Sequence, residues 1–185
     1  MLSLHFSKTL IKALSAFFSN SLGFDTKAGS IDSFDLGYYI AAHETAHQWW
    51  GGQLTPAAQL GSQLISEGLA EYSAYQVVRK NLDRKQSSLL LKSAQDSYFK
   101  TLVALSEAGN SKTILKYPKA DDIYLYYNKA LFSFAQITYM IGEQNVNKAL
   151  VELLNEFSRD SKKLATSDDL VLALLKNTDF KRVKI

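Results

Sequence analysis

The sequence has no cysteine, only two prolines and only three histidines among its 185 residues. Without cysteine, the chain can form neither a disulfide nor a thiolate metal site. Because the prolines are confined to Pro56 and Pro118, long stretches are free to be helical. No apolar run reaches the roughly 20 residues that a transmembrane helix needs, so we expect no membrane span within this chain.

The chain also lacks a strong excess of charge of one sign. Its formal net charge is +3, and basic and acidic residues are interleaved rather than clustered. This balance argues against a nucleic-acid partner. Hydrophobic residues make up 46% and charged residues 21%, which is ordinary for a globular protein with a real core.

The apolar periodicity predicts a mostly α-helical protein. We expect Asp83 to cap one helix and Asp121 or Asp122 to cap another. Gly51-Gly52 should end the helix expected over residues 36–50. The expected helices cover residues 7–19, 36–50, 62–80, 83–101, 122–141, 144–157 and 167–176.

The strongest chemical signal is the stretch H-E-T-A-H at residues 43–47. On a helix, His43 and His47 lie on one face, one turn apart. Neutral imidazole nitrogens suit Zn²⁺, and a carboxylate from a second helix can be the third protein ligand. Glu67 is the candidate for that carboxylate. The fourth position then stays open for water, as in a hydrolytic site rather than a structural one.

Two further glutamates have candidate roles. Glu44 follows the first histidine and is expected near the open position, where it can take a proton from water and hand it to a leaving amine. Glu71 lies one helical turn after Glu67 and is a candidate to accept a hydrogen bond from the non-coordinating N–H of a histidine. A solvated surface acid is an equally open interpretation of Glu71.

These residues resemble the gluzincin metallopeptidases and, within them, the aminopeptidase N family. In that family, H-E-x-x-H is followed after eighteen residues by the glutamate ligand, usually in an E-G-x-x-x-Y context. Here Q-W-W-G occupies residues 48–51, T-P residues 55–56 and E-G-L-A-E-Y residues 67–72. The intervening stretch has nineteen residues, and we expect the connection around residues 57–61 to absorb the extra one. The pattern is similar to a divergent branch, the peptidase-like domain fused to some bacterial ABC-type permeases.

The resemblance implies the helical half of a thermolysin-like zinc metallopeptidase catalytic domain, with the zinc site between two helices, Zn²⁺ as cofactor and a peptide as substrate. It also implies a tyrosine that stabilises the oxyanion. The stretch Y-N-K-A at residues 127–130 resembles the family's Y-x-K-G and assigns this role to Tyr127. On the residues alone, packing is the favoured interpretation of Tyr124, Tyr126 and Tyr127.

One family feature is missing. No G-x-M-E-N stretch, whose glutamate holds the substrate's amine, precedes the histidines, and S-N-S-L-G-F at residues 19–24 has no acid. Strict aminopeptidase specificity therefore does not follow, and the substrate-binding residues stay unassigned. The family's β domain has no room here, so we expect a fragment of a longer protein that could be attached to a membrane.

Within the chain we expect one domain, made of a lead-in helix and loop at 1–35, a zinc-site core at 36–142 and C-terminal helices at 143–185. Three hypotheses remain for its function. The first is a zinc-dependent peptidase. The second is a catalytically weak or inactive module with a binding or regulatory role in a larger membrane-transporter protein. The third is a helical domain without metal.

Overall fold

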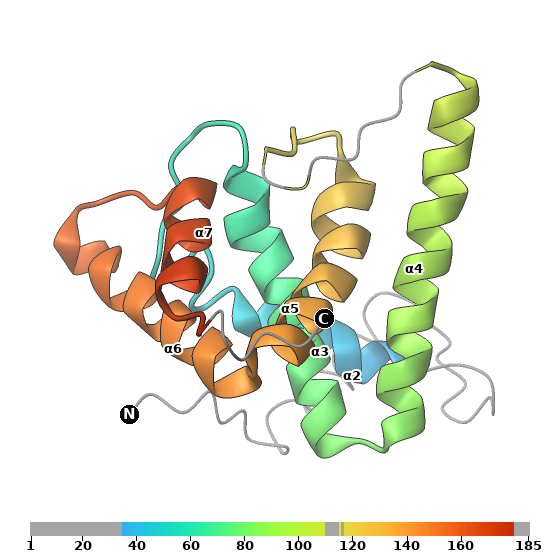
Figure 1. Ribbon diagram of the computed structural model, residues 1–185, viewed down its shortest axis with the longest axis horizontal. Helices are drawn as coiled ribbons and strands as arrows, with labels where there is room; N and C mark the ends of the chain where they lie inside the picture. The colour runs from blue at the N-terminus through green and yellow to red at the C-terminus, as the bar shows by residue number, and fades with distance from the viewer. Residues whose placement is uncertain (1–34, 110–114, 116, 180–185) are drawn as a thin grey trace.

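The computed structural model describes residues 35–109, 115 and 117–179, and every regular element in this part of the chain is helical (Figure 1). The prediction of a mostly α protein is confirmed. The helix expected over 7–19 lies outside the described residues. None of the described helices is long and apolar enough for a membrane span. The elements are α2 (Leu36–Ala46), η1 (Leu64–Gly68), α3 (Leu69–Asn81), α4 (Arg84–Glu107), η2 (Tyr124–Lys129), α5 (Ala130–Ile141), α6 (Glu143–Glu156), η3 (Arg159–Ser161) and α7 (Ser167–Lys176).

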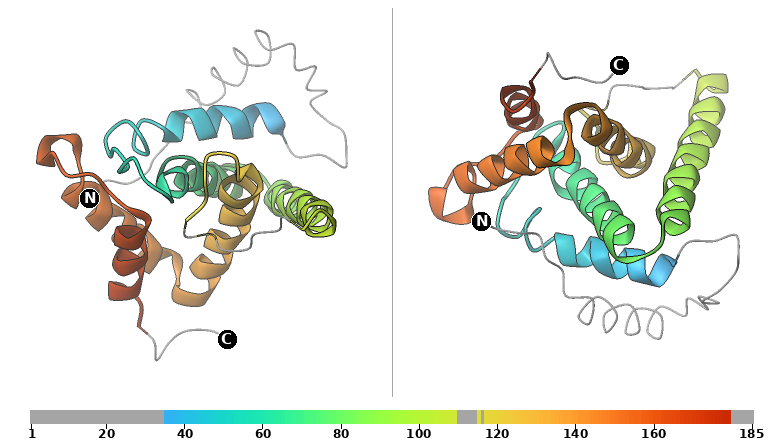
Figure 2. Two further views of the ribbon diagram at one scale, coloured as in Figure 1. Left: turned by 90° about the horizontal axis from the view of Figure 1, so that it is seen from above. Right: turned by 60° about the horizontal axis from the view of Figure 1, so that its bottom comes forward.

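Helices α2 and α3 pack against each other, and both views in Figure 2 show α2 next to α3. Three alanines of α2 are completely buried in the main core: Ala41, Ala42 and Ala46. Small side chains let two helix backbones approach closely, because no bulky group separates them. The close packing brings the residues of the two helices within reach of one another.

The helix that carries H-E-T-A-H is shorter than predicted. It begins as expected, with Asp35 accepting a hydrogen bond from the backbone N–H of Tyr38 at 2.9 Å, but it ends at Ala46 rather than Trp50. After it, the backbone N–H of Gly52 bonds back to the carbonyl of His47, five residues earlier, at 2.9 Å. Trp50 is completely buried, and its indole N–H donates to Ser73 at 2.9 Å. Burial of Trp50 against α3 therefore turns the chain out of the helix early.

The helix predicted over 62–80 consists of a π-helical part followed by an α-helical part. Its first part, η1, is a π-helix in which the N–H of Leu69 bonds to the carbonyl of Leu64, five residues back, and only then does the regular helix α3 begin. The helix predicted from Asp122 is divided in the same way, since η2 is also a π-helix. The cap by Asp121 or Asp122 stays a prediction: Asp122 directly precedes this helix and its carbonyl accepts from the N–H of Leu125 at 2.8 Å, while its carboxylate accepts from the N–H of Lys119.

The other boundaries agree more closely with the sequence. Asp83 caps α4 by accepting from the N–H of Gln86 at 2.8 Å, as predicted. The helix then continues to Glu107 instead of ending near residue 101, because no proline or glycine interrupts it before Gly109. At the start of α7, Thr166 and Asp169 form a reciprocal capping box.

The C-terminal helices support the connection between α2 and η1. The N–H of Arg159 donates to the carbonyl of Gln53 at 2.7 Å, and the N–H of Ala57 donates to the carbonyl of Ala165 at 2.8 Å. Helices α6 and α7 pack on each other on the side of the molecule opposite α4 (Figure 1). The connection that leads to Glu67 is thus held at Gln53 and at Ala57.

Candidate metal centre

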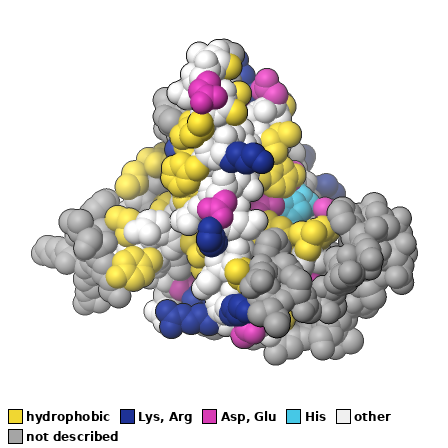
Figure 3. Space-filling view, turned by 90° about the vertical axis from the view of Figure 1, so that its right-hand side faces the viewer, with side chains coloured by type: hydrophobic (Ala, Val, Ile, Leu, Met, Phe, Trp, Pro, Cys, Tyr) yellow, Lys and Arg dark blue, Asp and Glu magenta, His cyan; other side chains and the backbone are white. Residues whose placement is uncertain are grey.

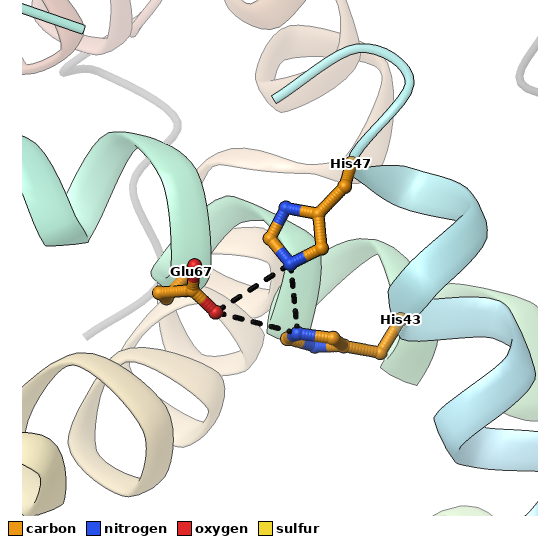
Figure 4. A group of neighbouring side chains, drawn as sticks. All are labelled: His43, His47 and Glu67. Carbon is orange, nitrogen blue, oxygen red and sulfur yellow. Dashed lines mark hydrogen bonds and ion pairs between the residues drawn. The ribbon is translucent and has the colours of Figure 1, made fainter. Parts of the chain in front are cut away.

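Three side chains from α2 and η1 converge on one point (Figure 4). His43 lies in the last turn of α2, His47 is the residue that caps its end, and Glu67 lies in η1. The Nε2 atoms of the two histidines are 3.1 Å apart. Oε2 of Glu67 lies 3.4 Å from Nε2 of His43 and 3.5 Å from Nε2 of His47. The structure therefore brings together the three residues that the sequence proposed as metal ligands.

The spacing of these three atoms fits one small cation. Zinc bonds to nitrogen and oxygen are about 2.0–2.2 Å long, so two corners of a zinc tetrahedron lie roughly 3.3–3.6 Å apart. The observed separations of 3.1, 3.4 and 3.5 Å are close to that range. A point about 2 Å from all three atoms lies just outside their plane, which leaves the fourth corner of the tetrahedron free.

The orientation of His47 leaves a lone pair facing the centre. Its Nδ1 lies 3.0 Å from the carbonyl oxygen of Trp50. A carbonyl oxygen can only accept, so in the neutral ring Nδ1 carries the hydrogen and Nε2 carries the lone pair. Trp50 is itself held by the bond to Ser73, whose hydroxyl also donates to the Leu69 carbonyl at 2.7 Å. The tautomer suited to a metal is therefore fixed by the fold.

The other histidine faces a side chain rather than a backbone group. Nδ1 of His43 lies 3.0 Å from Oε1 of Glu71, although the contact is not well directed for a hydrogen bond. Glu71 is only 5% exposed, so the interpretation of Glu71 as a solvated surface acid is wrong. When Glu71 is ionised, its carboxylate oxygen at Nδ1 favours the hydrogen there and leaves the lone pair of Nε2 of His43 facing the centre.

The electrostatics of the two glutamates differ. Protonated His43 or His47 can donate a hydrogen bond to Glu67, as the Tyr127 hydroxyl does, and these neighbours hold the pKa of Glu67 far below its usual range, so this residue is a carboxylate at neutral pH. Burial raises the pKa of Glu71 to about 8. The hydrogen bond to Glu67 is the main cause of the raised pKa of His47. A carboxylate beside two imidazole lone pairs is a donor set that favours a cation.

Of three neighbouring tyrosines, one reaches this centre. The hydroxyl of Tyr127, from η2, donates to Oε2 of Glu67 at 2.6 Å, and its ring stacks on that of His43 with centroids 5.7 Å apart. Tyr126 instead donates to the carbonyl of Ala120, and Tyr124 stacks on Tyr98. Burial, followed by the bond to Glu67, raises the pKa of Tyr127.

The centre is open to solvent. The side chains of His47 and Glu67 are 28% and 22% exposed, and histidine is visible at the molecular surface beside α4 in Figure 3. Glu44 is exposed on α2, and its charge contributes to the raised pKa of His47. The centre and Glu44 are therefore both reached by solvent.

Sequence reasoning missed two residues that support the site. Tyr39 donates a hydrogen bond to Oε2 of Glu71, and Ser73 holds Trp50. The only sequence signal for Tyr39 is its position one turn before His43, which puts both on the same helical face. Nothing in the sequence singles out Ser73.

Comparison with known proteins adds one finding. A family model described as the peptidase family M1 domain matches residues 12–184. No curated protein and no solved structure matches the chain. The matched range includes every described helix and all the residues of the centre.

Proposed function

Since the chain belongs to peptidase family M1, we propose that it is a zinc-dependent, aminopeptidase-like peptidase that hydrolyses peptide bonds. The resemblance to the aminopeptidase N family of gluzincins, inferred from the motif residues, is confirmed by this membership. The helical fold agrees with the helical half of such a peptidase domain.

The convergence of three lone-pair donors within 3.5 Å of one another is the observation that carries the proposal. In the proposed site, His43, His47 and Glu67 hold Zn²⁺. Two neutral nitrogens and one carboxylate leave net positive charge on the ion. When bound, the ion would act as a Lewis acid and lower the pKa of a water molecule toward neutrality.

The chain's own residues supply the proton transfer. Glu44 follows His43 directly and is solvent-exposed, as a base that meets a substrate must be. We assign it to take a proton from the attacking water and deliver it to the leaving amine. Glu71 is assigned to orient the ring of His43 through Nδ1.

Tyr127 is assigned to the oxyanion of the transition state. Its raised pKa means that the phenol keeps its proton at neutral pH and can donate it in a hydrogen bond. Such a bond accelerates the reaction, because the charge on the oxygen develops only as the carbonyl is attacked. The position of the hydroxyl beside Glu67 places this donor at the edge of the centre.

A second candidate function follows from the missing G-x-M-E-N stretch. Without an acid to bind the substrate's amine, the domain could be a weak or inactive peptidase-like module with a binding or regulatory role in a larger membrane-transporter protein. This alternative keeps the metal centre but loses turnover.

The variant Glu44→Gln tests the peptidase. It should retain stoichiometric zinc while hydrolysis falls by a factor of about 10² to 10⁴, the usual contribution of a general base. Zinc content is measured together with cleavage of N-unblocked and N-blocked peptides, and Glu107→Gln, an exposed exchange on α4, is the matched control. Unchanged turnover in Glu44→Gln would eliminate the mechanism. A wild-type chain that binds zinc but cleaves none of the peptides would favour the regulatory module.

A further inference from the structure

We propose that Tyr39 is a positioning residue of the metal centre, which fixes Glu71 and through it the ring of His43. This inference depends on the proposed function, since it assumes that His43 binds zinc.

The two oxygens of Glu71 face two different partners. Oε1 lies 3.0 Å from Nδ1 of His43, and Oε2 accepts a hydrogen bond from the hydroxyl of Tyr39. Glu71 is 5% exposed, so water has little access to these oxygens. A buried carboxyl group that lacks a partner for one oxygen is disfavoured. Tyr39 therefore determines which oxygen is left for the histidine.

The arrangement follows from helix geometry. Tyr39 and His43 are four residues apart on α2, so their side chains lie one above the other on the same face. Glu71 reaches across from α3 and contacts both. Because the two contacts come from a single rigid helix, rotation of the Glu71 carboxylate would break both of them at once.

The two histidines differ in how they are held, and this difference makes the hydrogen bond from Tyr39 to Glu71 important. His47 is oriented by the carbonyl of Trp50, a backbone group that cannot rotate by itself. His43 is oriented by a glutamate side chain, which has three rotatable bonds. The hydrogen bond from the hydroxyl of Tyr39 restricts rotation about these bonds of Glu71. Outer partners of this kind typically contribute 10- to 100-fold to metal affinity.

The neighbouring tyrosine provides a matched control. Tyr38 is 3% exposed, and its hydroxyl is buried with no hydrogen-bond partner among the described residues. Tyr38→Phe and Tyr39→Phe each remove one hydroxyl from adjacent positions of the same helix. Only the second breaks the contact with Glu71.

The experiment measures zinc affinity by chelator competition in the 185-residue chain. We expect Tyr39→Phe to weaken zinc binding about tenfold and Tyr38→Phe to change it less than about twofold. The visible spectrum of the Co²⁺-substituted chain should shift in Tyr39→Phe alone, because only there does the ligand geometry change. In a Glu71→Ala background, Tyr39→Phe should have no further effect, since the residue through which it acts is gone.

The outcomes separate this inference from the proposed function. If the wild-type chain binds no stoichiometric zinc, both fail. If the wild type binds zinc and Tyr39→Phe behaves like Tyr38→Phe, the positioning role of Tyr39 is overturned and the zinc site stands. An equal loss from Tyr39→Phe in the presence and absence of Glu71 would also overturn it, because the effect would not pass through that carboxylate.

Discussion

The histidines and the acid of this centre come from two different kinds of helix. His43 and His47 belong to α2 and its end, where the ordinary four-residue spacing puts both rings on one face. Glu67 and Tyr127 belong to η1 and η2, whose hydrogen bonds span five residues. π-helical turns are rare in proteins overall, but those that occur are often found at functional sites, where they redirect individual side chains. One half of the site thus follows from regular geometry, and the other half depends on a local departure from it.

The close contact of the two π-helical turns explains why a glycine follows Glu67. A Cβ atom at Gly68 would lie 2.8 Å from a methyl of Leu64 and 3.2 Å from the Cβ of Ala130. The missing side chain lets η1 approach the junction of η2 and α5. This approach allows the Tyr127 hydroxyl to reach Glu67 at 2.6 Å.

The π-helical turn η1 also bears on the number of residues between H-E-T-A-H and Glu67. Nineteen residues separate His47 from Glu67, where the family usually has eighteen. We expected the connection around residues 57–61 to absorb the extra residue. A five-residue hydrogen bond encloses one residue more than the α-helical bond does, so η1 offers a second place for it, directly at the ligand.

The largest expected effect is on zinc affinity, and it tests whether both kinds of helix supply ligands. We expect His43→Ala and Glu67→Ala each to weaken zinc binding by more than about 100-fold, beyond the effect of losing an outer partner. Chelator competition measures both. If Glu67→Ala binds zinc as tightly as the wild type, the π-helical half contributes no ligand.

The next effect separates the two π-helical residues from each other. Tyr127→Phe should lower turnover by a factor of about 10² to 10³, the usual effect of removing one oxyanion donor. Zinc affinity should fall much less than in Glu67→Ala, because the phenol is not a ligand and only donates a hydrogen bond to Glu67. Peptide cleavage and zinc titration on the same preparation check this, with Tyr126→Phe as the control. A large loss of zinc would instead make Tyr127 a support of Glu67.

A smaller effect concerns the packing between the two π-helical turns. Gly68→Ala should lower the free energy of unfolding by about 1–3 kcal/mol, because the added methyl overpacks the contact with Ala130. Urea denaturation measures the change. The double variant Gly68→Ala with Ala130→Gly should recover part of the loss. A stabilised Gly68→Ala, as expected for an unhindered helical glycine, would show that the turns do not need to approach so closely.

The smallest effect concerns the regular half of the site. Ser73→Ala leaves the buried indole N–H of Trp50 without its partner. It should cost about 1 kcal/mol more in unfolding free energy than Ser87→Ala, whose hydroxyl bonds within its own helix. Both serines are buried, so thermal or urea unfolding of the pair is a matched test. Equal costs would mean that Ser73 does not hold the end of α2.

Regular helices were the part of the fold that could be predicted. The periodicity and the capping residue Asp83 placed α4 at its correct start, and the charged start of α7 was placed well. The end of α2 was placed too late, because the burial of Trp50 against Ser73 is a tertiary contact. The π-helical turns leave no periodicity signal, since each is only five or six residues long.

At the site, the candidate ligands could be named from the sequence because their residue types and spacing are constrained by metal chemistry. The structure brings His43, His47 and Glu67 within 3.5 Å of one another and places Tyr127 beside them. Their catalytic roles stay predictions. The sequence puts Tyr39 on the same helical face as His43, but its contact with Glu71 depends on which face of α3 meets α2.

X-ray absorption spectroscopy of the zinc-loaded chain tests most directly whether the two kinds of helix hold a single ion. We predict one zinc per chain with four nitrogen or oxygen neighbours at about 2.0–2.1 Å, two of them with the outer-shell scattering of imidazole. In Glu67→Ala the protein oxygen should be replaced or lost while both imidazoles remain. A wild-type spectrum with six oxygen neighbours, or without two imidazoles, would contradict the account.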